Sequence, residues 1–273
     1  MPPMSATGFS SLFQPIRLCW NHRRLLGAAI LSEMRGMYAG SVLGLVWVAL
    51  GPIILLSIYT AIYTLVFKVQ PVGMTLEDYV LHVFAGLIPF IAFCGALTVG
   101  ALSISSNRQL LLNTVFPSEL IPIRSVLSAS TVLPVGLLLL MVFQLLRGDG
   151  TWFMALVPVV ILLQMMFLVG VSWVLSLLGL LLKDLGPLLN YVSLLLLIVT
   201  PIAYTPDMMP GYLRILIYVN PLYYFVNAYQ QLIVQGVLPS HGDCMVTLLL
   251  GVGAFALGHG VFRRGKDVFY DFA

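Results

Sequence analysis

The segment Gly260-Val261-Phe262-Arg263-Arg264-Gly265-Lys266 matches the first seven positions of a phosphate-binding loop. The eighth position, where a hydroxyl would bind magnesium, is Asp267, and the seven residues after Lys266 are too few for the helix and sheet that such a loop needs. We therefore interpret this segment as the basic end of a helix and expect neither ATP nor magnesium to bind to this chain.

Ionisable groups inside membrane segments are the usual mark of proton- or ion-coupled carriers. The long apolar runs of this chain contain none in their interiors, since His82 and His259 fall near the ends of runs. The three cysteines, Cys19, Cys94 and Cys244, lie too far apart to indicate a metal site or a disulfide framework. We expect no catalytic residue, metal or cofactor in this chain, so another protein supplies the energy or the chain is a passive pore.

Aromatic side chains in the first apolar run could contact sugars. Tyr59 and Tyr63 are one helical turn apart, and Trp47 lies further toward the cytoplasm. Aromatic faces stack on flat apolar surfaces such as those of sugar rings. Aromatic residues near the ends of spans also form the common interfacial belt. Both interpretations, a substrate conduit and a belt or core, stay open.

Basic residues precede the first run. Arg23, Arg24 and Arg35 could attract anionic lipid headgroups, because each Lys or Arg near the surface favours them by about 1 kcal/mol. The same arginines could instead only set the membrane topology.

Three glycines, Gly36, Gly40 and Gly44, recur every four residues into the first run. This spacing allows helices to approach closely in lipid. It is equally consistent with packing inside the chain and with packing between two copies.

The connection from Ser105 to Arg124 has the composition of a docking element. An amphipathic turn begins at Asn107 and Arg108, and the stretch Phe116-Pro117-Ser118-Glu119-Leu120-Ile121-Pro122 predicts a short helix held between two prolines. Such a rigid element could fit a groove of another protein. A plain connector is the alternative.

These residues must be positioned by membrane helices. The chain has 273 residues, of which 60% are hydrophobic and 8% charged, and its mean hydropathy is +1.03. Soluble domains are about 45–50% apolar and about 25% charged, so soluble enzymes and nucleic-acid-binding proteins are excluded. The apolar runs lack the alternating polarity of barrel strands, which predicts an all-α membrane protein.

The predicted transmembrane domain covers residues 38–262 and follows a cytoplasmic N-terminus, residues 1–37, with an amphipathic interface helix. Six spans are predicted at residues 38–67, 79–103, 125–146, 152–182, 188–204 and 245–262. With both termini in the cytoplasm, ten Lys and Arg residues lie inside and three outside, as the positive-inside rule requires.

The stretch from Tyr212 to Val234 is long enough for a seventh span, but Asn220-Pro221 interrupts it. A seventh crossing would leave seven basic residues inside and six outside, and the charge bias would disappear. We therefore predict two short helices that meet at Pro221 and re-enter from the outer face within residues 206–234. Residues 263–273 then form a cytoplasmic tail.

Several motifs occur in the order found in one family. They are Glu33-x-Arg35, Ser41-Val42-Leu43-Gly44-x-x-Trp47 with Pro52, Gly86-Leu87-Ile88-Pro89-Phe90, Asn107 with Phe116–Pro122, Lys183-Asp184-Leu185, Thr200-Pro201-Ile202-Ala203-Tyr204 and Asn220-Pro221-Leu222. Over nearly its whole length the chain resembles the membrane subunit of ATP-binding-cassette exporters for lipid-linked polysaccharides, which include O-antigen, capsule and teichoic-acid permeases.

The resemblance implies a homodimer of six-span subunits bound to two copies of a cytoplasmic ATPase. It implies that Leu12–Leu31 and the first cytoplasmic loop contact the ATPase, the loop through Asn107, Arg108, Leu111, Phe116, Pro117, Glu119 and Pro122. It also implies that the re-entrant helices, with Tyr204, Asn220 and Pro221, narrow the external mouth of a conduit lined by spans one and five. The chain departs from the family at Gly36-Met37-Tyr38, where relatives often carry a further basic residue.

The sequence therefore predicts a permease of the bacterial inner membrane that exports lipid-linked polysaccharide, most simply O-antigen, and performs no covalent chemistry itself. A drug or small-lipid exporter of the same superfamily would share the fold and the coupling loop. An ion-coupled or passive carrier would need no ATPase.

Overall fold

The computed structural model describes residues 10–62, 74–107 and 117–265. Within these ranges the chain forms helices, turns and bends and no β-strand, which confirms the prediction of an all-α fold. Four helical segments are long and apolar enough to cross a membrane, namely Leu76–Ala101, Leu120–Arg147, Trp152–Leu181 and His241–Gly265. The chain is therefore an integral membrane protein.

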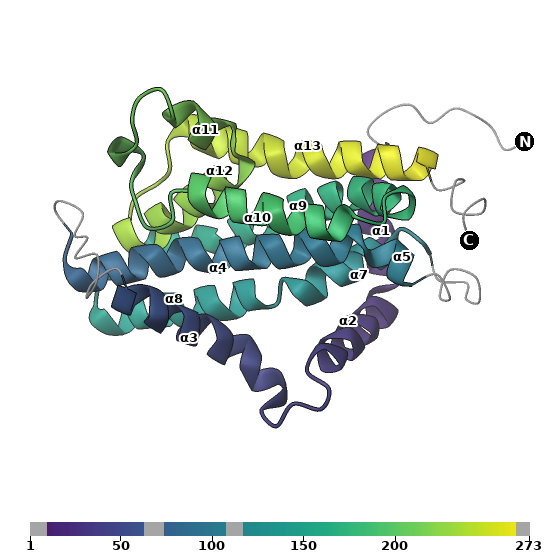
Figure 1. The fold of residues 1–273 in the computed structure, drawn as a ribbon, viewed down its shortest axis with the longest axis horizontal. Helices are drawn as coiled ribbons and strands as arrows, with labels where there is room; N and C mark the ends of the chain where they lie inside the picture. Colours follow the sequence, from purple (N-terminus) through teal and green to yellow (C-terminus); the bar gives the residue numbers. More distant parts are fainter. Residues whose placement is uncertain (1–9, 63–73, 108–116, 266–273) are drawn as a thin grey trace, which may run out of the picture.

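Helix α4 (Leu76–Ala101) is the centre of the bundle and packs against α7, α8, α9, α10 and α12 (Figure 1). The side chain of Thr75 caps its N-terminus by accepting a hydrogen bond from the Asp78 N–H at 3.2 Å. Glu77 and Asp78 in the first turn complement the helix dipole. The buried residues of α4 include Phe84, which belongs to the hydrophobic core of the bundle.

The next segment consists of α7 (Leu120–Ala129) and α8 (Val132–Arg147), which ends at Gly148 with a φ of +85°. A short 3₁₀ turn, η3 (Trp152–Leu156), leads into α9 (Val157–Leu181).

The last helix, α13 (His241–Gly265), lies along α9, and this is the most extensive contact between any two described elements (Figure 1).

Two shorter apolar helices complete the set of segments that overlap the six predicted runs. Helix α3 (Trp47–Ala61) packs against α8 and α4, and α10 (Leu185–Val199) packs against α4 and α9. Each has 15 residues. The first predicted run, 38–67, thus becomes an α-helix only at Trp47, after the 3₁₀ turn η1 (Gly44–Val46).

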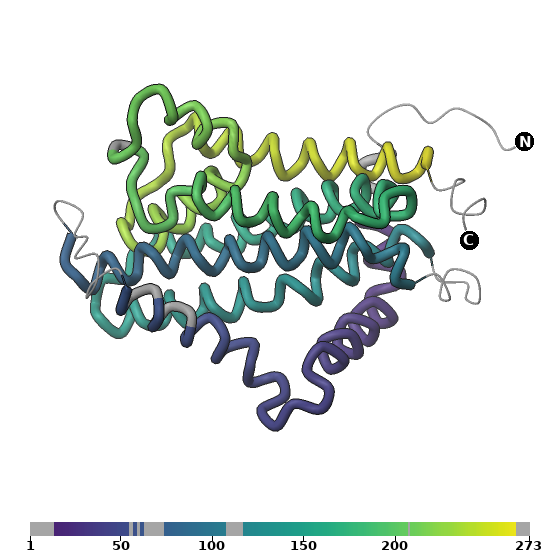
Figure 2. The backbone as a smooth tube through the Cα atoms, viewed as in Figure 1, coloured from purple at the N-terminus to yellow at the C-terminus, as the bar shows by residue number. Residues whose placement is uncertain are grey.

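The N-terminal helices are α1 (Ser10–Asn21) and α2 (Arg23–Met37). Helix α2 packs against α7, and α2 and α3 form an open V against one side of the bundle (Figures 1 and 2). The turn at the point of the V contains Gly40, with a φ of +81°, and Gly44, with a φ of +50°. The two glycines and Gly36 therefore do not share one helix, and the expectation of a helical glycine stripe is wrong because the chain turns between them.

After α10 the chain forms η4 (Pro206–Met208), α11 (Arg214–Val219), α12 (Pro221–Tyr229) and the π-helical turn η5 (Gln230–Gln235). Helices α11 and α12 meet at Pro221, which confirms the predicted break between two short helices. These elements cover the end of the bundle opposite α5 (Ser103–Ser106) (Figure 1).

Candidate functional site

The described ends of the predicted coupling segment, residues 105–107 and 117–119, lie at the end of the bundle that also contains α1 and the C-terminal end of α13 (Figure 1). Asn107 follows α5, and Pro117 and Glu119 are half-buried before α7 begins. The predicted residues Arg108, Leu111 and Phe116 lie outside the described residues. Pro122 is buried as the third residue of α7, where its missing N–H removes no helical bond. No separate helix therefore ends at Pro122, because α7 continues through it.

A polar network joins helix α2 to both ends of the coupling segment. The Arg124 Nε lies 2.9 Å from the Glu33 Oε2, and the Arg124 Nη2 donates to the Asn107 Oδ1 at 2.9 Å. Ser125 donates to the other Glu33 oxygen at 3.1 Å. Asn107 donates through Nδ2 to the Ser103 carbonyl at 2.7 Å. The Arg124 and Glu33 side chains are only 13% and 20% exposed, so the pair is largely withdrawn from water.

A second anchor holds the entry to α7. The Trp173 indole N–H of α9 donates to the Glu119 carbonyl at 3.1 Å. Trp173 is fully buried, and its ring contacts the rings of Phe255, His259 and Phe262 of α13. The start of α7 is therefore fastened to α2 through Arg124 and to α9 and α13 through Trp173.

The predicted headgroup residues Arg23, Arg24 and Arg35 are all exposed on α2. Arg23 donates to the Trp20 carbonyl at 3.0 Å, and its guanidinium carbon lies 4.9 Å from the centre of the Trp20 ring. The contact between the Arg23 guanidinium and the Trp20 ring joins α1 to α2. Basic and aromatic side chains are both typical of the headgroup region.

The predicted conduit residues are only partly described. Trp47 begins α3, donates to the Ser41 hydroxyl at 3.0 Å and is 38% exposed. It faces a cavity of about 450 Å³ between the V and the bundle, which Pro52 and Thr131 also line. Tyr59 lies in α3, and its side chain is outside the description, as is the whole of Tyr63.

The predicted gate residues fasten α12 and the segment after α10 to the C-terminal end of α10. Asn220 caps α12 by accepting from the Leu222 N–H at 3.0 Å and donates to the Thr200 hydroxyl at 2.8 Å. Pro221 is the first residue of α12, a position that suits its fixed φ. The Tyr204 hydroxyl lies 2.8 Å from the Val199 carbonyl at the C-terminus of α10.

Gln230 fastens the same elements from inside the bundle. Its side-chain nitrogen lies 3.3 Å from the carbonyls of His82 and Ile202. A Cβ at Gly86 would come within 2.9 Å of that nitrogen, so the glycine allows this close approach. Tyr79 adds a hydrogen bond to the Ala203 carbonyl at 3.0 Å.

Replacing Asn220 with Ala is expected to reduce the free energy of unfolding by about 1–2 kcal/mol, because the N-cap of α12 is lost. The measurement is unfolding of the purified protein in mixed micelles. Asn190→Ala is the matched control, since Asn190 is exposed in α10. Equal effects of the two substitutions would contradict the assigned role.

Comparison with known families decides the relationship. The model of the family described as ABC-2 type transporter matches residues 24–234, which is more than half of the chain. The chain belongs to this ABC-2 type transporter family. The match extends from α2 to η5 and therefore contains the Glu33–Arg124–Asn107 network and the predicted gate residues of this ABC-2 type transporter chain.

Curated relatives carry one name. The chain is 24% identical over 257 residues to the O-antigen export system permease protein RfbA of Myxococcus xanthus, covering 93% of this chain and 97% of the relative. Two proteins of the same name from Klebsiella pneumoniae are 30% and 27% identical, each covering 86% of this chain and 89% of the relative.

Sequence reasoning missed three residues of this ABC-2 type transporter site. It noted Glu33 and Arg124 without pairing them, although isolated charges beside apolar helices need partners and thus signal a contact. It did not assign a role to Trp173, because no sequence pattern indicates that an indole donates to a carbonyl 54 residues away.

Proposed function

We propose that this chain is the permease subunit of an ATP-driven exporter of lipid-linked polysaccharide, with O-antigen as the substrate class. The family and the names of the relatives support the substrate class. The observation that carries the mechanism is the network of Glu33, Arg124 and Asn107, because it joins the N-terminal helix to both ends of the coupling segment.

The proposed exporter contains a homodimer of this permease in the bacterial inner membrane. Two copies of a separate cytoplasmic ATPase bind to the homodimer. Each subunit has six spans, with α3 and α10 as the shorter ones, and both termini lie in the cytoplasm. Residues 206–234 re-enter from the outer face. The chain binds no cofactor, since ATP and magnesium bind to the ATPase.

Transport follows from movement of the coupling segment. The ATPase contacts Asn107–Pro122 and the N-terminal helices, and its cycle shifts this segment. Arg124 passes the shift to α2, and the path between the two subunits opens. Arg23, Arg24 and Arg35 attract the substrate pyrophosphate at the inner headgroup level.

The glycan then passes the aromatic residues Trp47, Tyr59 and Tyr63. At the outer end the path is narrowed by the elements that Tyr204 and Asn220 hold in place. The permease contributes binding and gating, and the covalent chemistry takes place in the ATPase.

Deleting the gene for this chain is expected to remove the surface glycan and to leave lipid-linked glycan on the cytoplasmic leaflet, because synthesis continues without export. The measurement is extraction of lipid-linked glycans together with staining of the cell surface. Reintroducing the intact gene is the control and restores the coat. An unchanged surface coat in the deletion strain would refute polysaccharide export and favour a drug or small-lipid exporter.

A further inference from the structure

A polar cavity of about 380 Å³ lies where α4 begins, α8 ends and η5 ends. Its size falls within the roughly 300–1,000 Å³ of typical small-molecule sites. The lining residues are Asp78, Gln144, Arg147, Asp149, Thr151, Val234, Gln235 and Gly236.

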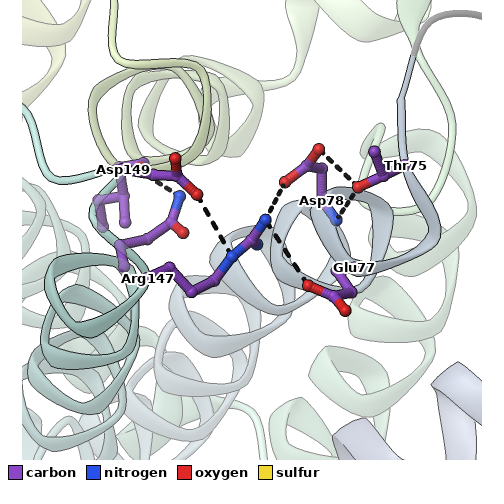
Figure 3. A network of polar contacts seen from close by, with 7 residues as sticks. Thr75, Glu77, Asp78, Arg147 and Asp149 are labelled. Carbon is purple, nitrogen blue, oxygen red and sulfur yellow. Dashed lines mark hydrogen bonds and ion pairs between the residues drawn. The ribbon is translucent and has the colours of Figure 1, made fainter.

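Arg147 is held at one edge of this cavity by carboxylates (Figure 3). Its Nη2 lies 3.1 Å from the Asp78 Oδ1 and 3.7 Å from the Glu77 Oε2, and its Nε lies 3.3 Å from the Asp149 Oδ2. Thr75 fixes Asp78 by donating to its other carboxylate oxygen at 2.6 Å. The remaining nitrogen, Nη1, is buried and has no hydrogen-bond partner among the described residues.

Two further buried atoms of the cavity lining lack a partner in the described part of the chain. Gln144 is only 1% exposed, and its Nε2 donates to the Ile233 carbonyl at 3.1 Å, which fixes the amide and leaves Oε1 without a donor. The second buried atom without a partner among the described residues is the Thr151 hydroxyl oxygen. Buried polar side-chain atoms are nearly always hydrogen-bonded, so three orphans in one cavity indicate a ligand or ordered water.

The orphan atoms define the chemistry of that ligand. Arg147 Nη1 is a donor, Gln144 Oε1 is an acceptor, and the Thr151 hydroxyl is both. An anion would meet the carboxylates of Asp78 and Asp149, and a cation would meet the free guanidinium edge. A neutral group with several hydroxyls, each able to donate and accept, fits all three atoms.

We propose that this cavity binds a sugar residue of the exported glycan as the chain emerges at the outer face. The proposal rests on the proposed function for the topology and for the presence of a glycan. It assigns a second contact with the substrate, in addition to the proposed contact with the aromatic residues of the conduit.

The test uses the full-length permease in lipid nanodiscs and saturation-transfer NMR. The probe is the soluble polysaccharide released by mild acid from the host cells' own surface. Sugar protons are expected to receive saturation from the native protein. Thr151→Val and Gln144→Leu each are expected to weaken binding by about fivefold, since each removes one hydrogen bond.

Thr151→Ser is the matched control, because it keeps the hydroxyl and is expected to bind as the native protein does. Absence of saturation transfer from the native protein to the sugar protons, equal losses with Val and Ser at position 151, or displacement of the glycan by calcium chloride or inorganic phosphate would each overturn the proposal. If the glycan fails to bind in the NMR experiment but the deletion strain still loses export, only this site is refuted. If binding depends on the Thr151 hydroxyl but the deletion strain keeps an intact surface coat, the exporter function is refuted and the sugar site remains.

Discussion

Replacing Arg124 with Leu is expected to reduce the free energy of unfolding by about 3 kcal/mol and to abolish surface glycan. Glu33 would keep its charge in a largely buried position without a partner, and breaking one side of such a pair typically costs about 3–5 kcal/mol. The measurement is unfolding of the purified permease in mixed micelles, with surface glycan as the readout of export.

The double variant Glu33→Leu/Arg124→Leu separates stability from coupling. Removing both charges leaves no buried ion, so stability is expected to return close to the native value. Export is expected to stay absent, because α2 is no longer joined to Asn107. Lys183→Leu is the control, because Lys183 is exposed and its replacement also removes one positive charge. Normal export by the stable double variant would contradict a coupling role.

The sequence was sufficient for the fold class and for the break at Pro221. A high apolar content and long apolar runs indicate that the chain folds in a membrane, and proline interrupts a helix because it lacks an N–H. Both signals can be read from a stretch of sequence without knowledge of the tertiary packing. The starts of helices were less predictable. The first run was expected to be helical from residue 38, but the turn with Gly40 at positive φ delays the helix to Trp47.

The candidate site was harder to predict, because its residues come together only in the packed bundle. Glu33 and Ser125 are 92 positions apart in the chain, and Tyr79 bonds a carbonyl 124 positions away. Composition and periodicity contain no such distances. The four-residue spacing of Gly36, Gly40 and Gly44 also gave a wrong prediction of close helix packing. Such a spacing places glycines on one face only if a single helix contains all three residues.

The glycines that do bring helices together lie between α9 and α13. A Cβ at Gly258 would overlap the backbone of Gly170, and a Cβ at Gly170 would overlap the carbonyl of Ala254. A Cβ at Gly251 would come within 2.8 Å of the Leu163 carbonyl. The two helices therefore touch backbone to backbone, as small residues allow in membranes, where dispersion contacts replace the hydrophobic effect between helices.

Replacing Gly258 with Ala is expected to destabilise the protein by about 3 kcal/mol, the upper end of the usual range for overpacking, because the obstacle is backbone and cannot rotate away. Gly260→Ala on the same helix is the matched control, since nothing lies within 4 Å of its Cβ. That control is expected to be neutral or to stabilise by up to about 1 kcal/mol, because Ala favours helix more than Gly. Unfolding in mixed micelles measures both. Equal stability changes would show that α9 and α13 are not in backbone contact, and Trp173 would then lose the support of α13 that holds the coupling segment.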